Sequence, residues 1–130
     1  MHAACSYDYA VIRVVPRVER QEFVNAGVIL WCREQDVLEA RVELDEGRLR
    51  MLDASVDVDA ARRHLASFSI ISAGGSDSGP IGKLPKRERF DWLVAPRSTI
   101  IQTSAVHSGR CDDVEHTLER LLDLMVRPAK

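Results

Sequence analysis

The stretch from Phe23 to Cys32 reads Phe-Val-Asn-Ala-Gly-Val-Ile-Leu-Trp-Cys and decides the fold. Its alternate residues divide into two faces, of which one is wholly apolar and the other is apolar except at Asn25 and Gly27. A strand with two apolar faces is typical of the inside of a sheet that is covered on both sides. The stretch therefore predicts a central strand, in which Gly27 marks a bulge or close packing and Asn25 bonds a neighbouring backbone group.

Strands are also predicted before and after this stretch. Residues 7–15 are mostly aromatic or β-branched and end at Pro16, which has no N–H to extend a β-ladder. Residues 37–44 alternate between apolar and polar or charged side chains, so we expect one face of this strand to meet water near the edge of the sheet. The short link at 33–36 favours an antiparallel hairpin between the second and third strands.

Helices are predicted where an aspartate precedes apolar residues at helical spacing, because its carboxylate can accept hydrogen bonds from the first turn. These helices are a short one at 45–53 capped by Asp45, a longer one capped by Asp57, and a last one capped by Asp112 or Asp113 that ends near Pro128. An amphipathic segment at 83–94 and a fourth strand at 99–103 complete the chain. The order of elements predicts one α+β domain over residues 1–130, with a mainly antiparallel sheet of about four strands covered by three to four helices.

Length and composition limit the classes of function. The chain has 130 residues, 45% of them hydrophobic, and 18 Lys and Arg against 20 Asp and Glu. This describes an ordinary soluble domain, neither disordered nor a polycation. No apolar run is long enough to cross a bilayer, and the three cysteines form no CxxC pair, so we expect a reduced, cytoplasmic setting. Residues 1–6 are expected to be a disordered tail and the Gly- and Ser-rich residues 73–82 a flexible loop.

Two segments carry polar residues for which folding gives no evident reason. One runs from Tyr7 through Arg13 and Pro16 to Arg20-Gln-Glu-Phe-Val-Asn-Ala-Gly-Val28, and the other is Ala95-Pro-Arg-Ser-Thr-Ile-Ile-Gln-Thr-Ser-Ala-Val-His-Ser-Gly109. Both resemble motifs of the bacterial family known as domain of unknown function 3037, and the resemblance extends over roughly residues 7–126. Thr103 stands where the family has a proline. The family has no established activity, but its members are often encoded beside a kinase-like protein of the Hip persistence-toxin type, which implies a protein partner.

These two segments also contain the residues expected to form a binding site for an anion or a partner. Arg13 shares its strand face with apolar residues, so its charge needs a partner. One prediction is an ion pair with Glu22 or Asp91; the other is that Arg13, Arg20 and Arg97 converge on an anion, because guanidinium groups suit planar oxyanions. The candidate residues are Arg13, Arg20, Glu22, Asn25, Arg97, Ser98, Thr99, Gln102, Ser104 and His107.

The leading hypothesis is a non-enzymatic cytoplasmic adaptor or regulatory partner of the kinase-like protein. The alternative is a module that binds nucleic acid or phosphate through the basic segment 83–97, with the cations Lys83, Lys86, Arg87 and Arg89, although the same pattern suits a solvated helix start. A third hypothesis is a hydrolase built on Ser98, Ser104 and His107, in which Gln102 and Ser104 line one pocket with His107 at its mouth. The chain has no GxSxG motif and no complete phosphate-binding loop, and neither a metal site nor a cofactor is predicted.

Overall fold

The computed structural model describes residues 4–129. Its elements in chain order are β1 (Cys5–Val14), η1 (Val18–Arg20), β2 (Val24–Cys32), β3 (Val37–Val42), α1 (Glu46–Leu52), α2 (Val58–Ala73), η2 (Ser76–Ser78), η3 (Ile81–Lys83), α3 (Lys86–Val94), β4 (Ile101–Thr103), β5 (His107–Cys111) and α4 (Val114–Met125), where η denotes a short 3-10 helix. The predicted α+β class and the antiparallel sheet are confirmed.

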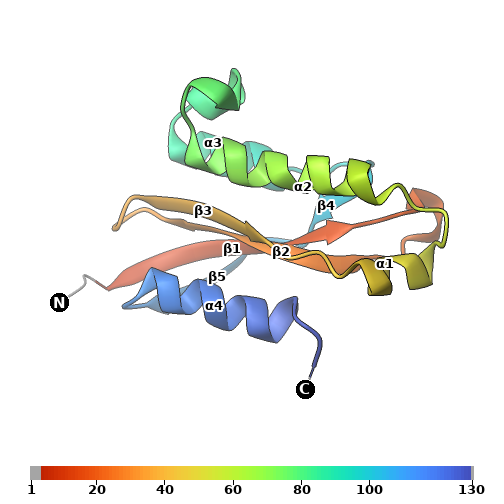
Figure 1. Ribbon diagram of the computed structural model, residues 1–130. Coiled ribbons are helices and arrows are strands. Elements are labelled where there is room, and N and C mark those ends of the chain that lie inside the picture. The colour runs from red at the N-terminus through yellow and green to blue at the C-terminus, as the bar shows by residue number, and fades with distance from the viewer. Residues whose placement is uncertain (1–3, 130) are drawn as a thin grey trace.

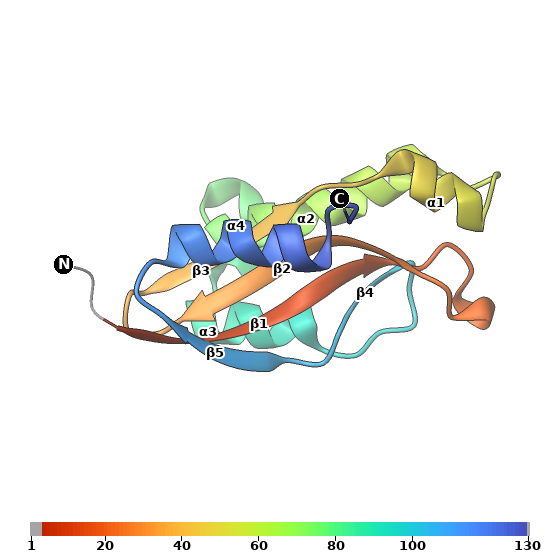
Figure 2. The ribbon, with the colours of Figure 1, turned by 90° about the horizontal axis from the view of Figure 1, so that it is seen from below.

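The sheet has five strands, and every pair of neighbours in it is antiparallel. Its order is β3-β2-β1-β4, and β5 also pairs with β1, beside the other half of that strand. Figure 2 shows β4 and β5 following one another along β1. β2 is therefore an inner strand and β3 an edge strand, as their two different hydrophobic patterns predict.

Helices cover both faces of the sheet. α2 and α3 lie on one face and α4 on the other (Figure 1). The larger core lies under α2 and α3 and includes Ile12 and Ile29, while the smaller one lies under α4 and includes Val28 and Leu30. Because successive strand residues point to opposite faces, β2 supplies apolar side chains to both cores.

A β-bulge changes the faces of β2. Ile12 pairs with Gly27 but Arg13 pairs with Asn25, so Ala26 is an extra residue opposite β1. The alternation predicted for residues 23–32 is therefore wrong at its start: Val24 and Ala26 lie in the core under α2 and α3, not with the residues that face α4.

Three capping aspartates begin the helices as predicted. The side chains of Asp45, Asp57 and Asp113 accept hydrogen bonds from the backbone N–H groups of Arg48, Ala60 and His116. These carboxylates also lie at the positive ends of the helix dipoles, where a negative charge is stabilising. The cap of α4 is thus Asp113 rather than Asp112.

Several boundaries differ from the predictions. β5 is a fifth strand that the sequence analysis missed, because its exposed or half-buried residues show no hydrophobic alternation and are held by backbone pairing with β1. β1 begins at Cys5, so residues 5 and 6 of the predicted tail are paired strand, and residues 1–3 lie outside the described residues. The segment 73–82 contains η2 and η3 with Ser78 and Gly82 buried, and its flexibility stays a prediction. Within residues 4–129, no helix is both long and apolar enough to span a membrane.

Candidate functional site

A polar pocket of about 320 Å³ lies beside the end of β1, where this strand pairs with the bulged start of β2. Its wall comes from four parts of the chain: the end of β1, the connection to β2, the segment before β4, and β4 itself. The lining residues are Arg13, Val15, Val18, Gln21, Phe23, Arg97, Ser98 and Gln102. We call this the arginine pocket. It brings together Arg13 and Arg97, which lie far apart in the sequence.

Arg13 is positioned by the sheet and by an aromatic ring. It pairs with Gln102 of β4, and its guanidinium carbon lies 4.1 Å from the centroid of the Phe23 ring, a cation–π contact. Its Nε is buried, and no hydrogen-bond acceptor meets it among the described residues. The predicted ion pair to Glu22 or Asp91 is wrong, because those carboxylates pair with other arginines.

The two carboxylates are taken by arginines closer to them in the sequence. Glu22 accepts from Nε of Arg20 at 2.5 Å, and Asp91 accepts from Arg87 at 3.2 Å, one helical turn away. Arg20 is exposed and does not line the arginine pocket, so the predicted convergence is found for Arg13 and Arg97 but not for Arg20. Short-range pairs such as these cost little chain entropy, which favours them over a pair with the more distant Arg13.

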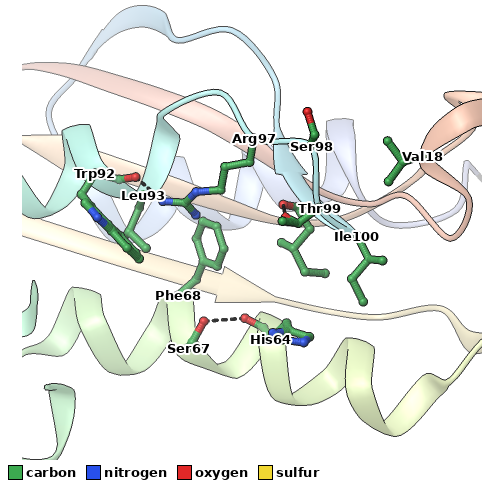
Figure 3. Close-up of a pocket in the computed structure, with 11 residues that line it drawn as sticks. Val18, His64, Ser67, Phe68, Trp92, Leu93, Arg97, Ser98, Thr99 and Ile100 are labelled. Atoms are coloured by element: carbon green, nitrogen blue, oxygen red, sulfur yellow. Dashed lines mark hydrogen bonds between the residues drawn. The ribbon is translucent and has the colours of Figure 1, made fainter.

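The side chain of Arg97 is also held in place by contacts other than an ion pair with a carboxylate. Its guanidinium carbon lies 4.3 Å from the centroid of the Trp92 ring, and it donates a hydrogen bond to the Trp92 carbonyl oxygen (Figure 3). Desolvation lowers the pKa of Arg97 below its ordinary value, and within residues 4–129 no acidic side chain forms an ion pair with it. At neutral pH the group remains charged because arginine ordinarily titrates far above that range.

An apolar cavity of about 590 Å³ adjoins the arginine pocket and shares Val18, Arg97 and Ser98 with it. Phe68 of α2 and Leu93 of α3 form part of its wall. Figure 3 shows Arg97 and Ser98 on the side of this cavity opposite α2. The combined site therefore offers a cationic compartment beside an apolar one.

Asn25 and Thr99 have structural partners. Asn25 donates from Nδ2 to the carbonyl oxygen of Met125, at the end of α4, at 2.9 Å. The predicted backbone bond is therefore present, with a partner that is distant in sequence. Thr99 donates to the carbonyl oxygen of Ile101, which steadies the turn into β4.

Among the described residues, no hydrogen bond joins Ser98 or Ser104 to His107. Ser104 accepts a hydrogen bond from the N–H of Val11 and donates to the carbonyl oxygen of Ala105, so its hydroxyl joins β1 to the chain after β4. Gln102 and Ser104 line one pocket, as predicted, but His107 does not line it. His107 packs against Tyr9, with ring centroids 5.5 Å apart.

The basic segment has internal partners. Arg89 is only 7% exposed and donates two hydrogen bonds of 2.9 Å to the carbonyl oxygens of Ile71 and Ser72, in the last turn of α2. Lys86 pairs with Asp36 at 2.9 Å. Of the four cations predicted to bind nucleic acid or phosphate, Arg89 therefore faces the protein interior.

Among the lining residues of the combined site that were not predicted as site residues are Gln21, Phe23 and Trp92. Phe23 was assigned to the apolar strand, yet it precedes β2 and is 43% exposed. Gln21 has a left-handed backbone with φ of 59°, which turns the chain toward β2. A signal was present for the aromatic residues, since each lies close in the sequence to a motif arginine, Phe23 to Arg20 and Trp92 to Arg97. Only the tertiary structure shows that Phe23 stacks on Arg13 instead.

The bonding state of two cysteines also differs from the reduced state expected from the sequence. Cys5 and Cys32 form a disulfide, with Cα atoms 6.2 Å apart, because antiparallel pairing brings the start of β1 against the end of β2. Glu34 adds a carboxylate, and the potential ligand atoms of these three residues lie within 4.8 Å of one another. With the two sulfurs bonded to each other, they are not free to act as thiolate ligands.

The fold and site define an α+β protein whose sheet is covered on both faces and in which two motif arginines, Arg13 and Arg97, line one pocket. Residues 9–126 match the model of a family described as "Protein of unknown function (DUF3037)", and the chain belongs to this family. Comparisons with curated proteins and with solved structures gave no match.

Proposed function

We propose that this protein is a non-enzymatic adaptor that binds an anionic group of a protein partner in the arginine pocket. One observation carries the proposal: Arg13 and Arg97 line one pocket, and neither forms an ion pair among the described residues. Carboxylates and phosphates are the groups that such planar, multiply donating cations recognise.

The surroundings of the two arginines favour binding over a purely structural role. Each guanidinium is stacked on an aromatic ring, so part of the entropy of ordering the side chain is already lost before a ligand arrives. The buried Nε of Arg13 has no acceptor within residues 4–129, and a buried polar group without a partner is costly. An incoming anion would supply that acceptor.

The apolar cavity favours a protein segment as the ligand. It adjoins the arginine pocket and is walled partly by Phe68, Leu93 and the exposed ring of Trp92. A peptide with an acidic group next to an apolar side chain would use both compartments, and aromatic and arginine residues are frequent anchors of protein interfaces. The gene neighbourhood of the family makes the kinase-like protein of the Hip type the partner to test first.

The test is co-expression with that neighbouring kinase-like protein, followed by gel filtration and calorimetry at micromolar concentration. We expect a stable complex, weakened about tenfold or more by either Arg13→Gln or Arg97→Gln, because hydrogen bonds to charged groups contribute about 1.5–3 kcal/mol. Arg20→Gln is the matched control: it removes a nearby arginine that is paired with Glu22 outside the pocket, and should change the affinity less than about twofold.

Two results would contradict the proposal. One is wild-type protein that elutes apart from the kinase-like protein; the other is a complex whose affinity is the same in the Arg13→Gln and Arg97→Gln variants. Salt-dependent binding to nucleic acid that is lost with Lys86→Ala and Arg87→Ala would instead support the alternative based on the basic segment.

A further inference from the structure

All three cysteines of the chain lie on neighbouring strands at one end of the sheet. Cys5 of β1 is bonded to Cys32 of β2, and on its other side it pairs in register with Cys111 of β5. All three belong to the core under α4, so their side chains lie on the same face. Cys5 is therefore the middle member of a row of three.

The three sulfur atoms differ in accessibility. Cys5 and Cys32 are 0% exposed, whereas Cys111 is half-buried and carries a free thiol. Cys111 is therefore the member of the row that lies nearest to solvent. Exposure and thiolate character are what decide the reactivity of a cysteine.

We propose that the three cysteines form a thiol–disulfide exchange site. Low-molecular-weight thiols and disulfides react there at Cys111, and Cys5 forms its disulfide bond with either Cys111 or Cys32. In the internal step, the Cys111 thiol loses its proton and its Sγ attacks the Sγ of Cys5. The bond from Cys5 to Cys111 forms as the bond from Cys5 to Cys32 breaks. Cys32 leaves with the electron pair and takes up a proton, so no oxidant or reductant is consumed.

The order of the strands suits this step. Exchange needs the attacking sulfur to approach the central sulfur from the side opposite the leaving one, and β2, β1 and β5 place Cys32 and Cys111 on opposite sides of Cys5. The backbone N–H of Gln35 donates to the Cys32 sulfur at 3.4 Å. This hydrogen bond stabilises negative charge on Cys32 as it leaves.

The same site accounts for oxidation of the reduced chain by a low-molecular-weight disulfide. The Cys111 thiolate attacks that disulfide, forms a mixed disulfide and releases one small thiol. Cys5 then attacks the Cys111 sulfur and releases the second small thiol. Cys32 finally attacks Cys5 and frees Cys111, so the chain loses two electrons and the reagent gains them.

The first test follows oxidation of the reduced, folded full chain by oxidised glutathione, with acid quenching and mapping of disulfide-linked peptides. We expect Cys111→Ser to slow formation of the Cys5–Cys32 bond about tenfold or more, because the remaining thiols are buried. Equal rates in the wild type and in this variant would overturn the proposal.

The second test uses two matched variants in glutathione buffer. Cys32→Ser should form a Cys5–Cys111 disulfide. Cys5→Ser should leave Cys32 and Cys111 unbridged, because β1 separates their strands by about 10 Å, beyond the Cα distance of about 7 Å that a disulfide spans. A Cys32→Ser protein that folds and keeps both thiols free would overturn the proposal.

The wild type provides a measurement that does not depend on a variant. After incubation of the oxidised chain with catalytic glutathione, peptide mapping should find the Cys5–Cys111 bond beside the Cys5–Cys32 bond, and an alkylating reagent should label Cys111 before either buried cysteine. Detection of the Cys5–Cys32 bond alone, with Cys111 unlabelled, would contradict the proposal.

Discussion

At the scale of single residues, the surroundings of an arginine decide what it does. Arg20 is exposed and paired with a nearby carboxylate, a contact that contributes little to stability. Arg13 and Arg97 lie over aromatic rings at a pocket and have no acidic partner among the described residues. Arg89 is buried and donates hydrogen bonds to carbonyl oxygens at the end of α2. Sequence motifs alone do not separate these three roles.

Arg89 carries the prediction at this scale. Its guanidinium donates to the carbonyl oxygens of Ile71 and Ser72 at the end of α2, where a cation is also favoured by the helix dipole. We expect Arg89→Met to lower the free energy of unfolding by about 2–3 kcal/mol, since hydrogen bonds to a charged group contribute about 1.5–3 kcal/mol. Urea unfolding measures the change.

The control for Arg89 is its neighbour Arg87. Arg87 is exposed and forms an ion pair with Asp91 one turn along α3. Arg87→Met should change the free energy of unfolding by less than about 0.5 kcal/mol. Equal effects of the two substitutions would mean that the buried contacts of Arg89 do not hold α2.

At the scale of elements, the close approach of β2 and β3 depends on Gly27. A Cβ atom at this position would lie 2.5 Å from the backbone carbonyl oxygen of Arg41, which cannot rotate away. We therefore expect Gly27→Ala to separate β2 from β3 locally and to lower the free energy of unfolding by about 3 kcal/mol, measured by thermal or urea unfolding.

Gly47 in α1 is the matched control for this substitution. A Cβ atom there would meet its nearest neighbour, a carboxylate oxygen of Asp45, at 3.4 Å, and the residue lies in a helix. Gly47→Ala should be neutral or stabilising by up to about 1 kcal/mol, because alanine loses less backbone entropy in a helix. A Gly27→Ala protein as stable as the wild type would show that β3 adjusts its position freely.

At the scale of the whole molecule, ion pairs join the end of α4 to the edge of the sheet that β3 forms. Arg127, just after α4, pairs with Glu43 at 2.7 Å, with Glu119 at 2.9 Å and with Asp123 at 2.8 Å. Glu43 follows β3, so this cluster links the last helix to the edge strand. Hydrogen bonding to Arg127 lowers the pKa of Glu43 below its ordinary value of 4.5.

This lowered pKa predicts a pH dependence. Between the folded pKa of Glu43 and 4.5, the unfolded chain binds more protons than the folded one, so the free energy of unfolding rises with pH. The contribution is fully present above that range and is lost as the pH falls through the folded pKa. Urea unfolding between about pH 3 and pH 6 should show a flatter profile for Arg127→Gln than for the wild type.

Arg110 on β5 supplies the control for the pH experiment, because it is exposed and remote from Glu43. Arg110→Gln should keep the slope of the wild-type profile. If Arg127→Gln also keeps that slope, the cluster at the end of α4 does not contribute to acid sensitivity.

The success of the sequence analysis varied with the distance over which a residue acts. Asp45 and Asp57 were identified as helix caps because a cap acts on the next turn of the chain. One of the two predictions for Arg13 was an acidic partner, but Arg13 stacks on Phe23, since the acids named for it have closer arginines. β5 was missed because its side chains carry no hydrophobic pattern and only its backbone is paired.

The amino-acid sequence by itself determined the α+β class, the inner position of β2, the helix caps and the two motifs that contain the site, because periodicity and capping are local properties of the chain. Only the tertiary structure decided the bulge opposite Ile12, the pocket shared by Arg13 and Arg97, and the row of Cys32, Cys5 and Cys111. The physical reason is that these features arise where segments distant in sequence pair and pack, and one extra residue in a strand is enough to change which side chains share a face.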